Sequence, residues 1–119
     1  MERINTFGEE LAKKRHVPLK SFLFDDGWDD TSTVWEFHSG FPNGFKPLTA
    51  AAQSFDAAPG IWLSPWGGYG GPRQQRLATG KAMGYEIDSQ GYALSGPKYY
   101  QRFHDVTMDL VKNQGVNQF

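Results

Sequence analysis

The chain has 119 residues, of which 12 are Lys or Arg and 13 are Asp or Glu, and this length fits a single domain. The formal net charge of −1 gives no positive field that would attract nucleic acid or an anionic membrane surface. The lack of cysteine excludes a disulfide framework, a thiolate zinc site and a cysteine nucleophile. No apolar run approaches the ~18 residues of a membrane-spanning helix, and the first residues lack a secretory signal pattern, so we expect no membrane partner and assign no compartment.

The N-terminal part predicts a helix, a strand and a loop. Thr6 and Glu9 have the spacing of a capping box, which predicts a short helix over residues 6–15. A continuous apolar run at residues 21–24 predicts a strand that is buried on both faces, as in a parallel sheet. Residues 27–44 are rich in Gly, Asp, Asn and Pro, which favours a loop.

The rest of the chain continues the alternation of helices and strands. A helix is predicted over residues 45–55 and a short apolar strand over residues 60–65. Residues 66–96 contain eight glycines and are interpreted as one long Gly-rich loop. Pro97 opens an amphipathic helix that Gly115 ends, and the last four residues resemble the start of another strand.

This order predicts an α/β protein built on a parallel sheet. Ligands of such sheets bind at the carboxyl ends of the strands, where residues 25–28 (DDGW) and 64–70 (SPWGGYG) follow two predicted strands. Aromatic residues make up 15% of the chain, and all four tryptophans lie within residues 28–66. Rings beside carboxylates suit a sugar, because a ring packs against its C–H face and carboxylates accept hydrogen bonds from its hydroxyls.

The candidate sugar-binding residues are Asp25, Asp26, Trp28, Trp66, Tyr69 and Arg73. Adjacent strand residues point to opposite faces, so Asp25 and Asp26 suit hydroxyl binding better than the acid and nucleophile roles of a glycosidase, whose carboxylates stand ~5–5.5 Å apart. The alternative for this pair is a turn in which one Asp caps the next segment. Arg73 and Arg76 either reach a ligand from the glycine-rich segment or are solvated. Trp62 lies in the middle of its predicted strand and is interpreted as a core residue.

Other chemistry lacks a complete motif. The acidic residues at 25–30 do not have the spacing of a calcium loop, and His16, His38 and His104 lie far apart, so no metal and no cofactor is expected. Residues 67–71 (GGYGG) lack the Gly-Lys-Ser/Thr ending of a phosphate loop, which disfavours a nucleotide-binding protein. No serine stands in a Gly-x-Ser-x-Gly motif, so a serine hydrolase is not indicated.

Three segments together resemble one enzyme family. Residues 22–28 (FLFDDGW), 40–48 (GFPNGFKPL) and 60–65 (GIWLSP) are similar, in this order and spacing, to the α-galactosidase (melibiase) clan of glycoside hydrolases. The resemblance covers most of residues 20–66, whereas residues 67–119 fit only in their alternation of helices and strands.

The resemblance implies a (β/α)8 barrel in which Asp25 and Asp26 bind the hydroxyls of an α-galactoside and Trp28 and Trp66 shape the subsite. The family nucleophile, in a Lys-x-Asp motif, and its acid/base have no counterpart in the chain, so no catalytic residue is assigned. Since such barrels have ~250 residues, residues 1–119 are expected to form one partial catalytic-barrel domain, a half barrel with about strands 2 to 4.

The expected function follows from this half barrel. The chain would be a fragment of a retaining glycoside hydrolase that binds sugar and is inactive alone. The alternative is a stand-alone carbohydrate-binding α/β module without catalysis. The open sheet edges of a partial barrel predict either self-association or a small open sheet between helices.

Overall fold

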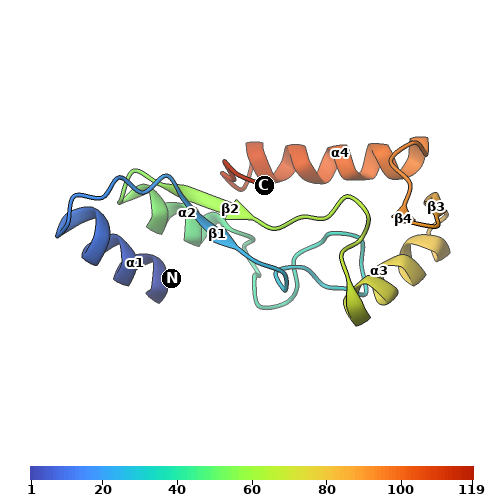
Figure 1. Cartoon of the computed structure of the whole chain (residues 1–119), viewed down its shortest axis with the longest axis horizontal. Coiled ribbons are helices and arrows are strands. Elements are labelled where there is room, and N and C mark those ends of the chain that lie inside the picture. The colour runs from blue at the N-terminus through green and yellow to red at the C-terminus, as the bar shows by residue number, and fades with distance from the viewer.

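The computed structural model describes residues 1–119, which form an elongated molecule of 50 × 24 × 23 Å (Figure 1). The elements in chain order are α1 (Glu2–Phe7), the π-helix η1 (Gly8–Lys13), β1 (Ser21–Phe24), α2 (Lys46–Gln53), β2 (Ala58–Ile61), α3 (Gly70–Ala82), β3 (Ile87–Asp88), β4 (Gly91–Tyr92) and α4 (Pro97–Lys112). None of these helices has both the length and the apolar character needed to cross a membrane.

Two small sheets are present, one left of the centre of the molecule and the other at its right end (Figure 1). In the first, β1 and β2 run in parallel, with Phe24 opposite Ile61. On the other edge of β2, Gln118 forms a parallel bridge with Gly60. β2 therefore has neighbours on both edges, whereas one edge of β1 has none. The second sheet is the short antiparallel hairpin of β3 and β4.

The predicted half barrel is wrong. The parallel sheet has only two strands of four residues each, and the other sheet is a separate antiparallel hairpin. A barrel needs several strands that pair side by side with a regular stagger. Here the sheet continues beyond β2 only as the isolated bridge between Gly60 and Gln118. The helices are spread along a long axis instead of covering one curved sheet (Figure 1).

The predicted long loop at residues 66–96 is also wrong, because this segment holds α3, β3 and β4. The glycines dominate its composition, but residues 73–79 (RQQRLAT) are mostly good helix formers. Pro72 lies in the first turn of α3, where the missing N–H leaves no hydrogen bond of the helix unmade. The helix of 13 residues therefore forms although it contains three glycines, at positions 70, 71 and 80.

Other boundaries differ less from the predictions. The N-terminal helix begins at Glu2, so Thr6 lies inside α1 and does not cap a helix. β2 begins at Ala58 and ends at Ile61, which places Trp62 just beyond the strand. The helices α2 and α4 lie where the sequence predicts them.

The helix α4 lies along the upper side of the molecule and spans from the hairpin to β2 (Figure 1). At its first turn the Glu86 carboxylate accepts hydrogen bonds from the main-chain N–H groups of Lys98 and Tyr99. Beyond its last turn, Gln114 accepts a hydrogen bond from the Phe45 N–H. A hydrophobic core of 15 buried residues runs through the whole length and includes Trp28 and Trp35 in the loop after β1.

Candidate functional site

The segments that follow β1 and β2 leave the sheet side by side. The Trp62 N–H donates to the Phe24 carbonyl over 2.7 Å, which continues the strand pairing by one residue. The Trp28 indole N–H donates to the Trp62 carbonyl over 2.8 Å. The two motifs that the sequence predicts at strand ends therefore meet in space, as the parallel register requires.

Arg76, on α3, is the centre of the polar contacts at this edge. Its Nε and Nη2 atoms donate to the two carboxylate oxygens of Asp29 over 2.8 and 2.6 Å. Nη2 also donates to Asp26 Oδ1 over 2.8 Å, and Nη1 donates to the Gly67 carbonyl over 3.2 Å. Neither the Arg76 nor the Asp29 side chain is exposed to solvent. Arg76 thus joins the segment after β1 to the segment after β2.

Aromatic rings and glycine backbone enclose the guanidinium. Its carbon lies 4.6 Å from the ring centroid of Trp35 and 5.8 Å from that of Trp62, in cation–π geometry. Gly68 has φ +88°, and a Cβ there would lie 2.8 Å from Arg76 Nη1 and 2.9 Å from Trp62 Cη2. Only glycine fits at this position, because the backbone is left-handed and the space is already filled.

The charge of Arg76 is maintained in spite of its burial. Desolvation by itself lowers the pKa of Arg76, but the hydrogen bonds and charges of Asp29 and Asp26 outweigh it and raise that pKa above its ordinary value. Two carboxylates face one guanidinium, so one negative charge is in excess within the cluster.

Asp26 is the member of this cluster that reaches solvent. Its side chain is 16% exposed, and Oδ1 accepts hydrogen bonds from Arg76 and from the Gly27 N–H. No protein group donates to Oδ2 of Asp26. Asp25 is exposed, and its Oδ1 accepts only from the Asp26 N–H. In each aspartate the Oδ2 atom is thus free to accept a hydrogen bond from a ligand. The Asp26 carboxylate is held in a fixed orientation by the hydrogen bonds to its Oδ1 atom.

The aromatic residues of the second motif lie beside the cluster. The Trp62 and Tyr69 rings meet edge to face with centroids 5.8 Å apart, and Tyr69 is 62% exposed. Trp66 is 53% exposed, and its carbonyl accepts from the Tyr92 N–H of the hairpin. Arg73 is half-buried and donates to the Gln90 carbonyl over 2.9 Å, which directs its guanidinium towards the hairpin.

Trp28 takes a different place from the other candidates. It is 2% exposed and packs between Trp35, at 6.2 Å between ring centroids, and Phe37, at 5.2 Å. Its indole N–H is already bonded to the Trp62 carbonyl. Its role at the strand ends is therefore to support them from the core.

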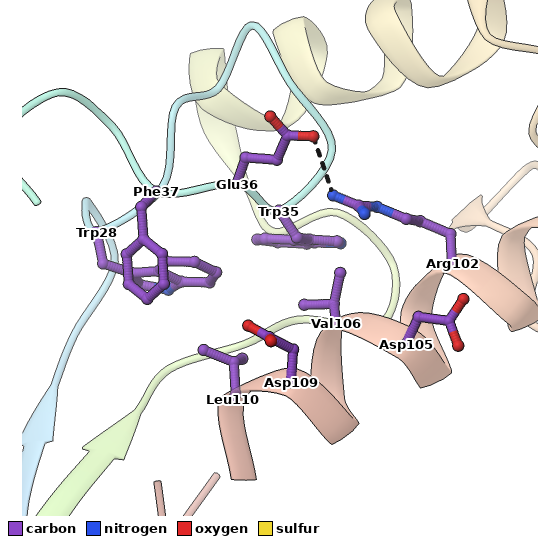
Figure 2. A pocket seen from close by; sticks show the side chains of 9 residues that line it. All are labelled: Trp28, Trp35, Glu36, Phe37, Arg102, Asp105, Val106, Asp109 and Leu110. Carbon is purple, nitrogen blue, oxygen red and sulfur yellow. Dashed lines mark hydrogen bonds and ion pairs between the residues drawn. The ribbon is translucent and has the colours of Figure 1, made fainter. Parts of the chain in front are cut away.

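Trp28 and Trp35 also line a cavity of about 350 Å³ on the other side of this loop, against α4 (Figure 2). The Arg102 guanidinium donates to the Val34 carbonyl and lies 3.4 Å from Glu36 across the cavity mouth (Figure 2). Asp105 and Asp109 project from α4 at its edge. Both indole N–H groups are bonded within the protein, so the two rings offer this cavity apolar surface and no hydrogen-bond donor.

Where the Asp26–Arg76 cluster reaches solvent, at Asp26, it borders an open surface and not a cavity. Asp26, Trp66, Tyr69 and Arg73 line none of the five cavities, whereas Asp25 lies at the end of a cavity of about 420 Å³ along α1 and β1. No group of three or more His, Asp and Glu residues is placed to hold a metal ion. The geometry thus provides hydrogen-bond acceptors and exposed rings on a shallow surface.

The sequence did not identify Asp29 as a site residue. Both alternatives predicted for Arg76, a ligand contact from a glycine-rich loop and a solvated side chain, are wrong, because Arg76 is fully buried and ion-paired within the protein. Asp29 is one residue beyond the DDGW motif, and Arg76 is separated from it by 47 residues. The available signal is the run of helix formers at residues 73–79, which places Arg76 on a helix. The glycine content concealed that helix.

Comparisons with known proteins found no match: no protein-family model, no curated protein sequence and no solved structure matched this chain.

Proposed function

We propose that this chain binds a sugar of the α-galactoside type through the surface at the carboxyl ends of β1 and β2. The observation that carries the proposal is the Asp26 carboxylate, which Arg76 holds with one oxygen unpartnered, while the same guanidinium lies against the Trp62 ring that meets Tyr69. A sugar ring presents hydroxyl donors and an apolar C–H face, and the segments after the two strands supply both carboxylate acceptors and exposed rings. The type of sugar rests on the resemblance to the α-galactosidase clan.

The role proposed for Asp25 and Asp26 is binding and not proton transfer. A carboxylate that is ion-paired to a buried guanidinium acts as an acceptor, whereas a glycosidase general acid must arrive protonated. The chain is therefore proposed as a carbohydrate-binding α/β module that acts without catalysis. The second form of the proposal is that the same binding surface belongs to a retaining glycoside hydrolase. Because the surface is open, we expect an affinity in the millimolar range, about −4 kcal/mol.

Titration with galactose, followed by intrinsic tryptophan fluorescence and by NMR, tests the proposal. We expect saturable binding to wild type. Asp26→Ala should weaken it at least about tenfold, because a charge-assisted hydrogen bond contributes roughly 1.5–3 kcal/mol. Tyr69→Ala should weaken it about fivefold through loss of ring contact.

Two matched variants control for general effects. Tyr100→Ala removes an exposed tyrosine from α4, and Asp88→Asn removes an exposed charge from the hairpin, so neither should alter galactose binding. Near-UV circular dichroism confirms that each variant is folded. Absence of any response of wild type to galactose at tens of millimolar would refute the proposal.

A hydrolysis assay separates the two forms of the proposal. We expect no turnover of an aryl α-galactoside by this chain, since Asp25 and Asp26 are assigned to binding. Turnover that Asp25→Asn abolishes would show that a catalytic carboxylate pair operates in the chain, and the binding-only role would then be wrong.

We also propose that the chain self-associates through the free edge of β1. Along that edge Met1, Phe7 and Leu23 are all exposed and surround the cavity of about 420 Å³. An unpaired strand edge with apolar side chains favours pairing with the same edge of a second copy, which would bury both.

Light scattering after size-exclusion chromatography checks this second proposal. The apparent mass should rise with concentration, and Leu23→Lys should abolish the rise, because charges on a strand edge oppose pairing. Val111→Lys, an equally charged change of an exposed apolar residue on α4, serves as the control. A wild-type chain that stays monomeric at millimolar concentration contradicts self-association.

A further inference from the structure

We infer that Arg76 fixes the Asp26 site as a pure hydrogen-bond acceptor, so that the surface selects neutral and amino sugars and rejects sugar acids. This inference rests on the proposed function and names the ligand class of the same site. Arg76 is a positioning residue in this scheme, since it acts through Asp26 and does not touch the ligand.

The first support is the use of the Arg76 donors. Of five N–H groups, Nε–H and the two on Nη2 are directed to Asp29 and Asp26, and one on Nη1 is directed to the Gly67 carbonyl. Nη1 lies so close to Gly68 that a Cβ there would be only 2.8 Å away, and no part of the Arg76 side chain is exposed. Arg76, the cation within the cluster, therefore offers no N–H group to a ligand bound at Asp26.

The second support is the net charge at this edge. Asp26 and Asp29 already exceed Arg76 by one negative charge, and the exposed Asp25 adds a second. A carboxylate anywhere on a monosaccharide bound to Asp26 would lie within about 8 Å of these charges, which is the screening length at physiological ionic strength. Like charges brought together without a donor between them oppose binding. The ammonium group of an amino sugar at the same distance would instead be attracted by these negative charges.

Arg73 is the nearest other cation of α3 and must be considered. Its Nη2 donates to the Gln90 carbonyl, and that bond draws the guanidinium to the hairpin side of the helix. Arg73 therefore does not compensate the acidic edge at Asp26. Removal of Arg73 is thus expected to leave the preference among sugars unchanged.

Competition among three related sugars tests the inference on the wild-type chain. Galactose, galactosamine and galacturonate share the hydroxyl pattern of one ring and differ in charge at neutral pH. We expect galactosamine to bind at least as tightly as galactose, and galacturonate at least about tenfold more weakly, the equivalent of about 1.4 kcal/mol. Equal affinities for galactose and galacturonate would overturn the inference and leave the proposed function intact. No binding of any of the three would overturn both.

Two variants test the positioning role. Asp26→Asn keeps an oxygen for Arg76 but places an amide donor at the surface, so the ratio of galacturonate to galactosamine affinity should rise at least about fivefold. Asp88→Asn makes the same change of net charge on the hairpin and should leave the ratio unchanged. Arg76→Lys keeps the charge but cannot bond both aspartates in the same plane. It should weaken galactose binding, while near-UV circular dichroism should show that the variant remains folded.

Two results would refute the positioning role of Arg76. One is an unchanged ratio of galacturonate to galactosamine affinity in Asp26→Asn, and the other is an unchanged galactose affinity in a folded Arg76→Lys variant.

Discussion

Arg76 and Asp29 form a two-pronged ion pair, with donor–acceptor distances of 2.8 and 2.6 Å, in which neither side chain has any exposed surface. Buried ion pairs owe their stability to complete hydrogen bonding, because each charge has lost its hydration. Here the main-chain carbonyl of Gly67, the Asp26 carboxylate and the Trp35 ring complete the surroundings of the guanidinium. The pair fixes the loop after β1 against α3.

Removal of one partner of this pair should be strongly destabilising. Arg76→Ala leaves the Asp29 carboxylate buried without a counter-charge, and we expect a loss of roughly 3–5 kcal/mol in the free energy of unfolding. Urea unfolding followed by tryptophan fluorescence measures it. Lys81→Ala, an exposed change on the same helix, should stay within about 0.5 kcal/mol of wild type. Similar stability of the two variants would show that the pair is dispensable.

Two glycines on either side of the start of α3 should respond in opposite ways to alanine. Gly68→Ala places a Cβ against Arg76 and Trp62 in a left-handed backbone, and we expect a destabilisation of about 1–3 kcal/mol. Gly71→Ala meets nothing within 4 Å inside the helix, and we expect a gain of about 0.4–1 kcal/mol. Thermal unfolding of both variants checks this, and a tolerated alanine at Gly68 would contradict the packing described around Arg76.

Stability at alkaline pH should depend on Tyr92. Burial raises the pKa of Tyr92 to about 12, from 10.0, and its hydroxyl donates to the Arg76 carbonyl. Since the folded state holds this proton more tightly than the unfolded state, the contribution is complete below pH 10 and is lost as the pH rises towards 12. The loss is on the order of 2 kcal/mol.

The pH dependence of unfolding in Tyr92→Phe isolates this effect from other tyrosines and lysines. We expect Tyr92→Phe to be less stable than wild type at pH 8, because it loses the hydrogen bond to the Arg76 carbonyl, but its stability should fall less steeply between pH 10 and 12. Tyr100→Phe, which changes an exposed tyrosine, should keep the wild-type slope. Parallel curves for wild type and Tyr92→Phe would contradict the raised pKa.

Stability at acid pH should depend on Glu86, the carboxylate at the start of α4. The Tyr99 main-chain N–H lowers the pKa of Glu86, with a smaller contribution from the Lys98 N–H. The stabilisation is therefore present above pH 4.5 and is lost as the pH falls through the lowered pKa. Glu86→Gln should lower the melting temperature at pH 7 and flatten its decline below pH 4.5, whereas Glu2→Gln should do neither.

Local patterns in the sequence predicted the elements with clear periodicity, and long-range packing decided the rest. The apolar run at β1 and the amphipathic pattern of α4 identify both elements with nearly correct bounds. The barrel prediction failed because it extended two short strands into a curved sheet that the chain does not form. The loop prediction at residues 66–96 is wrong because the helix formers at residues 73–79 outweigh the helix-breaking effect of the glycines around them.

The candidate site could also be predicted only as far as local sequence patterns define it. Asp25, Asp26 and Tyr69 follow from their positions after strands, which is local information. The buried place of Trp28 and the central place of Arg76 depend on contacts across 34 and 47 residues. No spacing rule along the chain indicates which of two arginines, three residues apart, will meet an aspartate so distant in sequence.

The way in which α4 is held at both ends has a consequence for the order of folding. Its first turn depends on Glu86, but its C-terminal end bonds to Phe45, 69 residues earlier in the chain. Because contacts between segments so distant in the chain form late in folding, we expect α4 to dock after α2 and the hairpin have formed. In pulsed hydrogen exchange during refolding, the amides of α4 should gain protection last, and the two ends should gain it together.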